Sequence, residues 1–265
     1  MTTPIPYGLY GYELGSQMGL YQLIRATSLV DTGTFSPRAG AAALKIDQTL
    51  PNVYNWEAWH PAGQSGDLGI GEFKALTDMV GVGFDFRISA LPATKPAGVA
   101  TFLLTATLDA FNLCVDTDGK LHWYYNDAFA VGGGPGISTG SAGNRVLAAN
   151  TWYRMYIWFD GRNGTTYSLV SAIGAIDSDG LTVDALGSGT FTTALSGTPG
   201  VEVDAGGLPE TVTAPGVSTY YDNAVCWQNA QSGQHNLLDA VVLKALAEAD
   251  GTDLDFTVTN TGGDG

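Results

Sequence analysis

The spacing of the apolar residues constrains the fold of this chain more than any other feature. They alternate with polar residues or form short blocks rich in Val, Ile, Thr, Tyr, Phe and Trp, bounded by Gly, Pro, Asn and Asp. This pattern is typical of β-strands, and helical periodicity is almost absent. The segments that fit a strand are Gly8–Leu14, Ala41–Ile46, Met79–Ile88, Phe102–Leu108, Phe111–Asp116, Lys120–Tyr125, Trp152–Asp160, Tyr167–Ile173, Val201–Asp204 and Thr219–Trp227. So many strands in 265 residues predict an all-β sandwich or barrel.

The clearest local element is a β-hairpin over Phe111–Tyr125. Its two strands flank Asp118-Gly119, a dipeptide suited to the positive φ angles of a tight primed turn. Two long loops are expected, at about Asn52–Lys74 and Asp127–Ala149. Long loops on a rigid sheet often carry function.

The chain is predicted to form one domain over residues 1–265, because it has no visible internal repeat or linker. Its first and last long strands, Gly8–Leu14 and Thr219–Trp227, are expected to lie close together. The segment Leu237–Leu246 fits either a helical stripe or a buried strand.

The charge balance excludes some classes of partner. Lys and Arg number 11 against 26 Asp and Glu, giving a formal charge of −15. Such a surface repels phosphate backbones and anionic head groups, so neither nucleic acid nor membrane insertion is expected. Cys114 and Cys226 stand far apart, which predicts two buried thiols of a protein made in a reducing cytosol.

Two sequence patterns were tested for catalysis. Gly136-Ile137-Ser138-Thr139-Gly140 matches a nucleophile elbow, but no helix pattern follows, so we interpret it as a flexible loop. Glu202 and Asp204 share one face of a strand, as glycosidase carboxylates can, but the next positions are Gly206 and Gly207 and supply no third carboxylate. They are interpreted as solvated strand-end charges. We therefore predict no enzymatic activity and no catalytic residue.

No metal or cofactor is predicted. His60, His122 and His235 are too scattered for a local zinc site, and His122 is interpreted as a half-exposed sheet residue. Asp116–Gly119 and Asp177–Gly180 resemble the start of a calcium loop but lack its later ligands, so both are interpreted as turns. Calcium bound between separate loops is left open.

Aromatic residues supply the candidate contact site. They cluster in the first long loop, in the hairpin strand and just after it, where they either stack on sugars or partner surfaces or pack within the sheet. The candidates are Tyr54, Trp56, Trp59, Trp123, Tyr124, Tyr125 and Phe129.

The order of several short segments resembles a known family. The segments are Gly11-Tyr12-Glu13 with Gly15, Gly40–Ile46, the Asp118-Gly119 hairpin, Trp152-Tyr153-Arg154 ending in Asp160-Gly161, and Tyr221-Asp222-Asn223 before Val225. Together they resemble the concanavalin A-like, laminin-G-like jelly roll, particularly the versions in virion proteins of tailed bacteriophages. The resemblance implies a two-sheet antiparallel sandwich, with a further strand over Val241–Ala247.

The resemblance and the missing catalytic motifs together predict a non-enzymatic virion component, such as a capsid decoration, head-fibre or tail-associated protein. Such a protein is expected in the virion, after synthesis in the cytoplasm of the bacterial host. It would act in many copies, bound to itself or to a shell or tail protein. The alternative is a lectin-like module that binds carbohydrate, including host-surface glycans, and a glycoside hydrolase is the least favoured function.

Overall fold

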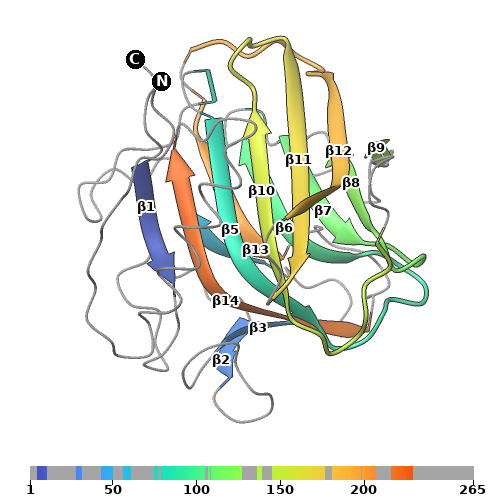
Figure 1. Cartoon of the computed structure of the whole chain (residues 1–265). Coiled ribbons are helices and arrows are strands. Elements are labelled where there is room, and N and C mark those ends of the chain that lie inside the picture. The colour runs from blue at the N-terminus through green and yellow to red at the C-terminus, as the bar shows by residue number, and fades with distance from the viewer. Residues whose placement is uncertain are drawn as a thin grey trace, which may run out of the picture.

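The structure, a computed structural model, shows two antiparallel β-sheets packed face to face (Figure 1). It describes residues 5–10, 28–31, 43–49, 56–60, 75–76, 79–104, 107, 109–126, 136–138, 145–176, 181–197, 199–206 and 216–228. Among these residues, none belongs to a helix long and apolar enough to cross a membrane. The described part of the chain is therefore all-β, as the apolar pattern predicted.

The larger sheet has eight strands in the order β12-β11-β10-β5-β14-β3-β2, with β1 paired to β14. Their bounds are β1 Ile5–Tyr10, β2 Ser28–Asp31, β3 Ala43–Gln48, β5 Met79–Ile88, β10 Tyr153–Asp160, β11 Thr166–Ala175, β12 Thr182–Thr190 and β14 Val217–Gln228. The pairing of β1 with β14, with Leu9 opposite Val225, confirms that the first and last predicted strands lie side by side.

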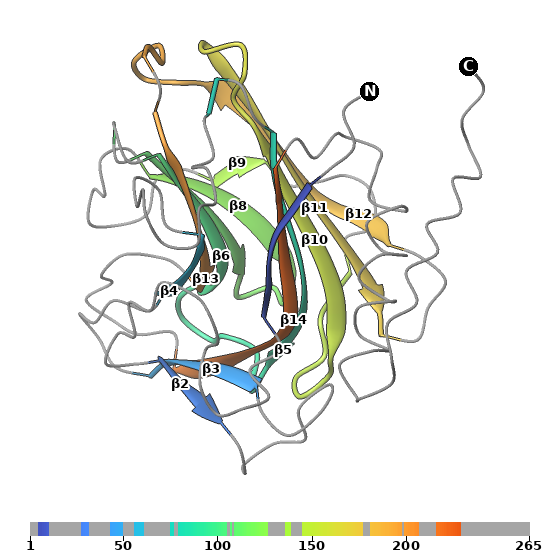
Figure 2. The ribbon, with the colours of Figure 1, turned by 90° about the vertical axis from the view of Figure 1, so that its left-hand side faces the viewer.

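The smaller sheet has six strands in the order β4-β13-β6-β7-β8-β9. Their bounds are β4 Trp56–His60, β6 Ala97–Leu104, β7 Asp109–Val115, β8 Leu121–Asn126, β9 Gly136–Ser138 and β13 Val201–Gly206. Figure 2 shows this sheet and the larger one as two separate layers. Each sheet therefore has one face toward the core and one facing outward.

The core is formed by alternate residues of both inner faces. Phe84 and Phe86 of β5 and Phe159 of β10 pack from the larger sheet, while Phe102 and Phe111 pack from the smaller one, all with 0% exposure. The Phe111 ring centroid lies 5.2 Å from that of Phe159. Burying a side chain of this size contributes about 2–3 kcal/mol, so these contacts hold the two layers together.

Two polar side chains of the larger sheet bond to the smaller sheet at a bulge in β6. The register of β6 against β7 shifts between Gly98 and Ala100. The side-chain amide of Gln48 accepts from the Gly98 N–H and donates to its carbonyl, both at 2.9 Å. The Tyr221 hydroxyl donates to the Val99 carbonyl at 2.7 Å. The backbone groups near the bulge are thus satisfied from the opposite sheet.

The predicted hairpin is confirmed, but its turn differs from the one expected. Gly119 has φ 76°, its N–H donates to the Asp116 carbonyl, and the Asp116 N–H donates to the Lys120 carbonyl. Within the described residues, positive φ outside glycine occurs only at Asn150 and Asn223. The connection is therefore a three-residue loop with one left-handed glycine, and not a primed two-residue turn.

Several other predictions need correction or stay open. The predicted loop Asn52–Lys74 contains β4, the loop Asp127–Ala149 contains β9, and the predicted strand Phe102–Leu108 is found as β6, which starts at Ala97. Strands β2 and β12 were not predicted. The ambiguous segment Leu237–Leu246 lies outside the described residues, and the single-domain assignment stays a prediction.

Candidate functional site

A row of polar side chains crosses the outward face of the smaller sheet. Asp204 of β13 is opposite Thr101 of β6, Thr101 is opposite Asn112 of β7, and Asn112 is opposite Tyr124 of β8. Residues in register across neighbouring strands point to the same face, because side chains alternate along each strand. The pairing therefore places four hydrogen-bonding groups in a line perpendicular to the strands.

The middle of this row is held by short hydrogen bonds. The Thr101 hydroxyl lies 2.8 Å from Oδ1 of Asn112 and 3.2 Å from the carbonyl oxygen of Gly206. Asn112 has 0% exposure and Asp204 has 2%. Glu202 and Asp204 are thus buried in the middle of the sheet, which corrects their interpretation as solvated strand-end charges.

The accessible end of the row lies on the hairpin formed by β7 and β8. Nε2 of His122 lies 3.0 Å from Oδ2 of Asp118, and these side chains are 18% and 46% exposed. Burial by itself would raise the pKa of Asp118. Hydrogen bonds from the Lys120 amide and from His122 outweigh it, so the pKa of this carboxyl is lowered. Asp118 is therefore an anion that orients the imidazole, and His122 is partly exposed as expected.

Tyr124 is the second accessible group on this face. Its hydroxyl donates a hydrogen bond to the carboxylate of Asp116. Burial, followed by the hydrogen bond to Asp116, raises the pKa of the phenol above its usual value. Tyr124 therefore keeps its proton at neutral pH and acts as a hydrogen-bond donor.

Cys114 lies opposite His122 in the hairpin register, also on the outward face. Burial raises the pKa of its thiol well above the usual value, and the charge of Asp116 raises it further. A neutral buried thiol is a poor nucleophile. Both Cys114 and Cys226 are buried, as predicted.

The three predicted aromatic contact residues of β8 do not share one face. Tyr124 points outward, but Trp123 is in the core with 0% exposure, and its ring packs beside Phe102. Tyr125 packs against the core, where its ring stacks on Phe111. The backbones of Trp56 and Trp59 lie in β4, an outer strand of the smaller sheet, while Tyr54 and Phe129 lie outside the described residues.

Of the remaining motif predictions, one is wrong, one is confirmed and one stays untested. Ser138 lies in the short strand β9, paired with Trp123, so the flexible-loop interpretation is wrong at this position. Asp116–Gly119 forms a turn, as interpreted. Within the described ranges, no group of three or more His, Cys, Asp or Glu side chains is arranged to hold a metal ion. The expectation about calcium stays untested.

Thr101, Asn112 and Asp116 were not among the predicted site residues. For Asn112 and Asp116 the signal is the alternation Asn112-x-Cys114-x-Asp116 on one hairpin strand and His122-x-Tyr124 on the other. These five side chains share one face only in the register that the three-residue loop sets.

Comparisons with known proteins show the fold. No family model and no curated protein matches the chain. Among solved structures, the chain is similar to an endo-β-1,4-glucuronan lyase from the fungus Trichoderma reesei, with a TM-score of 0.52 and 13% identity over 84% of this chain and 95% of the lyase. It is also similar to the alginate lyase vAL-1 from a Chlorella virus, with a TM-score of 0.53 and 11% identity over 84% of this chain and 99% of that one.

A third similar structure is the binding domain of botulinum neurotoxin DC in complex with rat synaptotagmin II. The TM-score is 0.51 and the identity is 8%, over 89% of this chain and 51% of the toxin chain. At such identities the likeness shows the fold alone. It confirms the predicted two-sheet antiparallel jelly-roll β-sandwich.

The comparisons overturn the prediction that the protein is not an enzyme. Two of the structures that share its fold across most of their length are polysaccharide lyases. The prediction rested on the missing third carboxylate and the missing serine elbow, which belong to hydrolysis. A lyase cleaves by elimination and needs a base and a proton donor instead, so the absence of hydrolase motifs does not exclude catalysis.

Proposed function

We propose that this protein binds an extended polysaccharide chain on the outward face of the smaller sheet, at the β7–β8 hairpin. The observation that carries the proposal is the row of in-register polar side chains that ends in the accessible Tyr124. A sugar chain offers hydroxyl groups at regular spacing, and the accessible Tyr124, His122 and Asp118 supply donors and acceptors for them on a rigid hairpin.

Only the Tyr124 end of the row is accessible, because Asp204, Thr101 and Asn112 are buried. A ligand would therefore meet the row at the hairpin. The accessible pair His122 and Asp118 extends the face along the hairpin toward its turn. The jelly-roll fold shared with a glucuronan lyase and an alginate lyase supports a carbohydrate ligand.

The test is calorimetric titration with alginate, glucuronan and a neutral β-glucan. Tyr124→Phe removes only the hydroxyl and is expected to weaken binding by about fivefold, the effect of one hydrogen bond. Tyr156→Phe is the matched control, because Tyr156 belongs to β10 in the other sheet. The proposal fails if none of the polysaccharides binds, or if the two variants weaken binding equally.

A second candidate function is cleavage of a uronic-acid polymer by β-elimination. The observation that favours it is that His122 and Tyr124 come from the same face of one hairpin and are both partly exposed. His122, oriented by Asp118, would take the proton at C5. The C4–O bond then breaks as a C4–C5 double bond forms, and the neutral Tyr124 phenol protonates the leaving oxygen.

Elimination leaves an unsaturated sugar that absorbs ultraviolet light, so incubation with alginate or glucuronan provides the assay. His122→Ala is expected to abolish the absorbance rise, while Thr151→Ala, at an exposed position just before β10 of the other sheet, leaves it unchanged. If the wild-type protein binds these polymers without any rise, the elimination proposal fails and the binding proposal stands.

The site of action is a separate proposal. The resemblance to phage virion proteins supports placing the protein on a virion, in contact with itself or with a shell or tail protein, where it meets host-surface glycans. Antibodies raised against the protein should label purified particles if this is correct. Labelling confined to the supernatant of lysed cells would contradict the virion assignment.

A further inference from the structure

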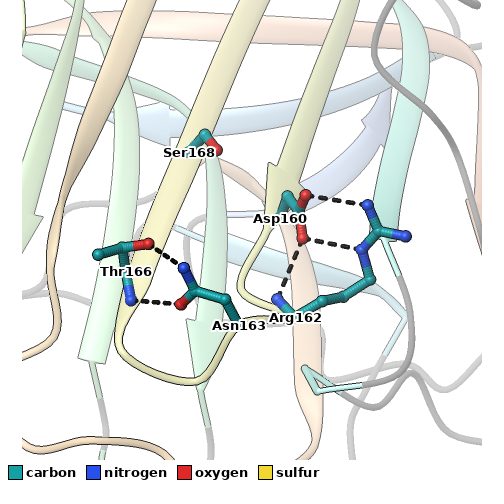
Figure 3. A pocket seen from close by; sticks show the side chains of 5 residues that line it. All are labelled: Asp160, Arg162, Asn163, Thr166 and Ser168. Atoms are coloured by element: carbon teal, nitrogen blue, oxygen red, sulfur yellow. Dashed lines mark hydrogen bonds and ion pairs between the residues drawn. The ribbon is translucent and has the colours of Figure 1, made fainter.

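A polar pocket lies on the other sheet, at the end of the hairpin formed by β10 and β11. It has a volume of about 350 Å³ and is lined by Asp160, Arg162, Asn163, Thr166 and Ser168 (Figure 3). Asp160 and Ser168 are directly opposite each other in the register of the two strands. The pocket belongs to the larger sheet, so it is separate from the row on the smaller sheet.

The loop that forms this pocket is rigid. Gly164 has φ 75°, and its N–H donates to the Gly161 carbonyl at 3.0 Å. Oδ1 of Asn163 accepts from the Thr165 N–H at 2.8 Å and from the Thr166 N–H at 2.6 Å. The Gly164 carbonyl in turn accepts from the Leu195 N–H at 2.7 Å, which ties the loop to the segment after β12. A ligand would therefore meet groups that are already in place.

Asp160 and Arg162 hold each other in a fixed geometry. Nε of Arg162 lies 3.0 Å from Oδ1 of Asp160, and Nη2 of Arg162 lies 3.1 Å from Oδ2 (Figure 3). This bidentate pair raises the pKa of Arg162 and leaves no net charge between the two groups. A guanidinium has five N–H groups, and this pair uses two of them. The Arg162 side chain is 44% exposed and the Asp160 side chain is 23% exposed, so a ligand can reach both.

Two hydroxyl groups complete the pocket. Thr166 accepts a hydrogen bond from the Asn163 amide, so its own O–H can still donate. Ser168 lies across the pocket from Arg162 in Figure 3. Within the described part of the chain its side chain forms no hydrogen bond.

We propose that this pocket binds one neutral sugar residue through a pair of adjacent hydroxyl groups. A diol both donates and accepts, and the pocket presents a fixed carboxylate that accepts beside a guanidinium and hydroxyls that donate. The Asp160–Arg162 pair is neutral as a whole, which disfavours a phosphate or uronate as the ligand. All five lining side chains are polar, so hydrogen bonds, and not ring stacking, give the specificity.

The pocket is shallow and its rim is exposed, so binding by a single sugar is weak. The experiment is therefore a nuclear magnetic resonance titration of the isotope-labelled protein, which detects weak complexes. The probes are the methyl glycosides of glucose, mannose and galactose, with glucuronate and inorganic phosphate as charged comparisons. We expect saturable shifts of the backbone signals of residues 160–168 with at least one methyl glycoside.

Substitutions of the lining residues test whether the methyl glycosides bind in this pocket. Ser168→Ala is expected to weaken binding about fivefold, and Arg162→Lys, which keeps the charge but loses the bidentate geometry, at least as much. Thr151→Ala is the matched control, because Thr151 is an exposed residue just before the opposite end of β10. Tyr124→Phe should leave this binding unchanged, since Tyr124 lies on the other sheet.

Three results would overturn the proposal. The first is the absence of any shift at residues 160–168 with the three methyl glycosides. The second is binding of glucuronate or phosphate alone, which would assign the pocket to anions. The third is an equal loss of binding in Ser168→Ala and Thr151→Ala.

Discussion

The Tyr221 hydroxyl of the larger sheet donates a 2.7 Å hydrogen bond to the Val99 carbonyl of the smaller sheet. It also lies 3.1 Å from the Gly206 N–H, which donates to it. The Tyr221 ring packs between Phe84 and Phe86, with ring centroids 5.9 and 5.7 Å away. One buried side chain therefore joins three strands, β14, β6 and β13, from both layers.

The first prediction is that Tyr221→Phe lowers the free energy of unfolding by about 1–3 kcal/mol. The ring and its packing remain, but the Gly206 N–H and the Val99 carbonyl lose a partner in a buried place. Urea unfolding followed by tryptophan fluorescence measures the change. Tyr124→Phe, which removes a half-buried hydroxyl, is the comparison and should cost less. Equal losses in the two variants would contradict the cross-sheet role of Tyr221.

A second prediction concerns the hairpin turn next to the candidate site. Gly119→Ala places a side chain at φ 76°, with its Cβ 3.0 Å from Cγ1 of Val146 and 3.3 Å from Cδ1 of Leu91. The left-handed conformation costs about 1–2 kcal/mol, and crowding adds to it. Gly197→Ala is the control, because Gly197 has a similar positive φ but no atom near the added Cβ. The difference in stability between the two variants therefore measures the crowding at Gly119. Thermal unfolding should show a larger loss for Gly119→Ala. A loss no greater than that of Gly197→Ala would show that the turn tolerates the extra atom.

The turn also explains why the site could not be assembled from the sequence. A two-residue turn at Asp118-Gly119 would set Asn112 opposite Tyr125 and Cys114 opposite Trp123. The observed three-residue loop shifts the register by one, so that Asn112 is opposite Tyr124 and Cys114 is opposite His122. A one-residue shift changes which side chains share a face. The hairpin was predictable from alternation, but its register depended on the turn geometry.

Strand β12 shows a different limit of the sequence pattern. Its residues Gly187 and Gly189 face large inner side chains: a Cβ at Gly187 would meet Cδ1 of Leu169 at 3.1 Å, and Gly189 lies against Tyr167. Glycine makes room for these neighbours, so the inner face of β12 lacks the apolar residues that mark a strand. Strands β5, β10 and β14 carry their own large inner residues, which is why they were predicted.

A third prediction concerns a buried charged cluster on the outward face of the larger sheet. Asp85 and Asp222 are directly opposite each other with 0% exposure. Nε of Arg154 lies 3.3 Å from Oδ1 of Asp85, and the Asn223 amide donates to Oδ2 at 3.2 Å. Arg154→Met should lower the free energy of unfolding by about 3 kcal/mol, because it removes the cation that is paired with the buried carboxylate of Asp85.

The double variant Arg154→Met with Asp85→Asn provides the control for this cluster. Replacing the carboxylate by an amide removes the uncompensated charge, so the double variant should recover part of the stability in urea unfolding. A double variant less stable than Arg154→Met alone would contradict an electrostatic origin of the loss.

The last prediction is a pH dependence that arises from Asp184 in β12. This residue is 3% exposed and lies where the register against β11 shifts. Burial raises the pKa of its carboxyl from 3.8 to about 6, although the charge of Arg145 and a backbone hydrogen bond from Arg145 oppose the shift. Between these two pKa values the folded protein binds a proton that the unfolded chain does not. The wild-type protein is therefore more stable below pH 3.8, where Asp184 is protonated, than at neutral pH, and this extra stability is lost as the pH rises to about 6.

The variant Asp184→Asn cannot ionise at this position. The difference in unfolding free energy between the variant and the wild type should therefore grow by about 1–2 kcal/mol as the pH rises through that window. Asp118→Asn is the control of opposite sign, because the lowered pKa of Asp118 stabilises the fold at neutral pH and that stabilisation is lost on acidification. Urea unfolding of the three proteins at closely spaced pH values measures both slopes, and a wild-type slope unchanged by Asp184→Asn would show that this carboxyl titrates normally.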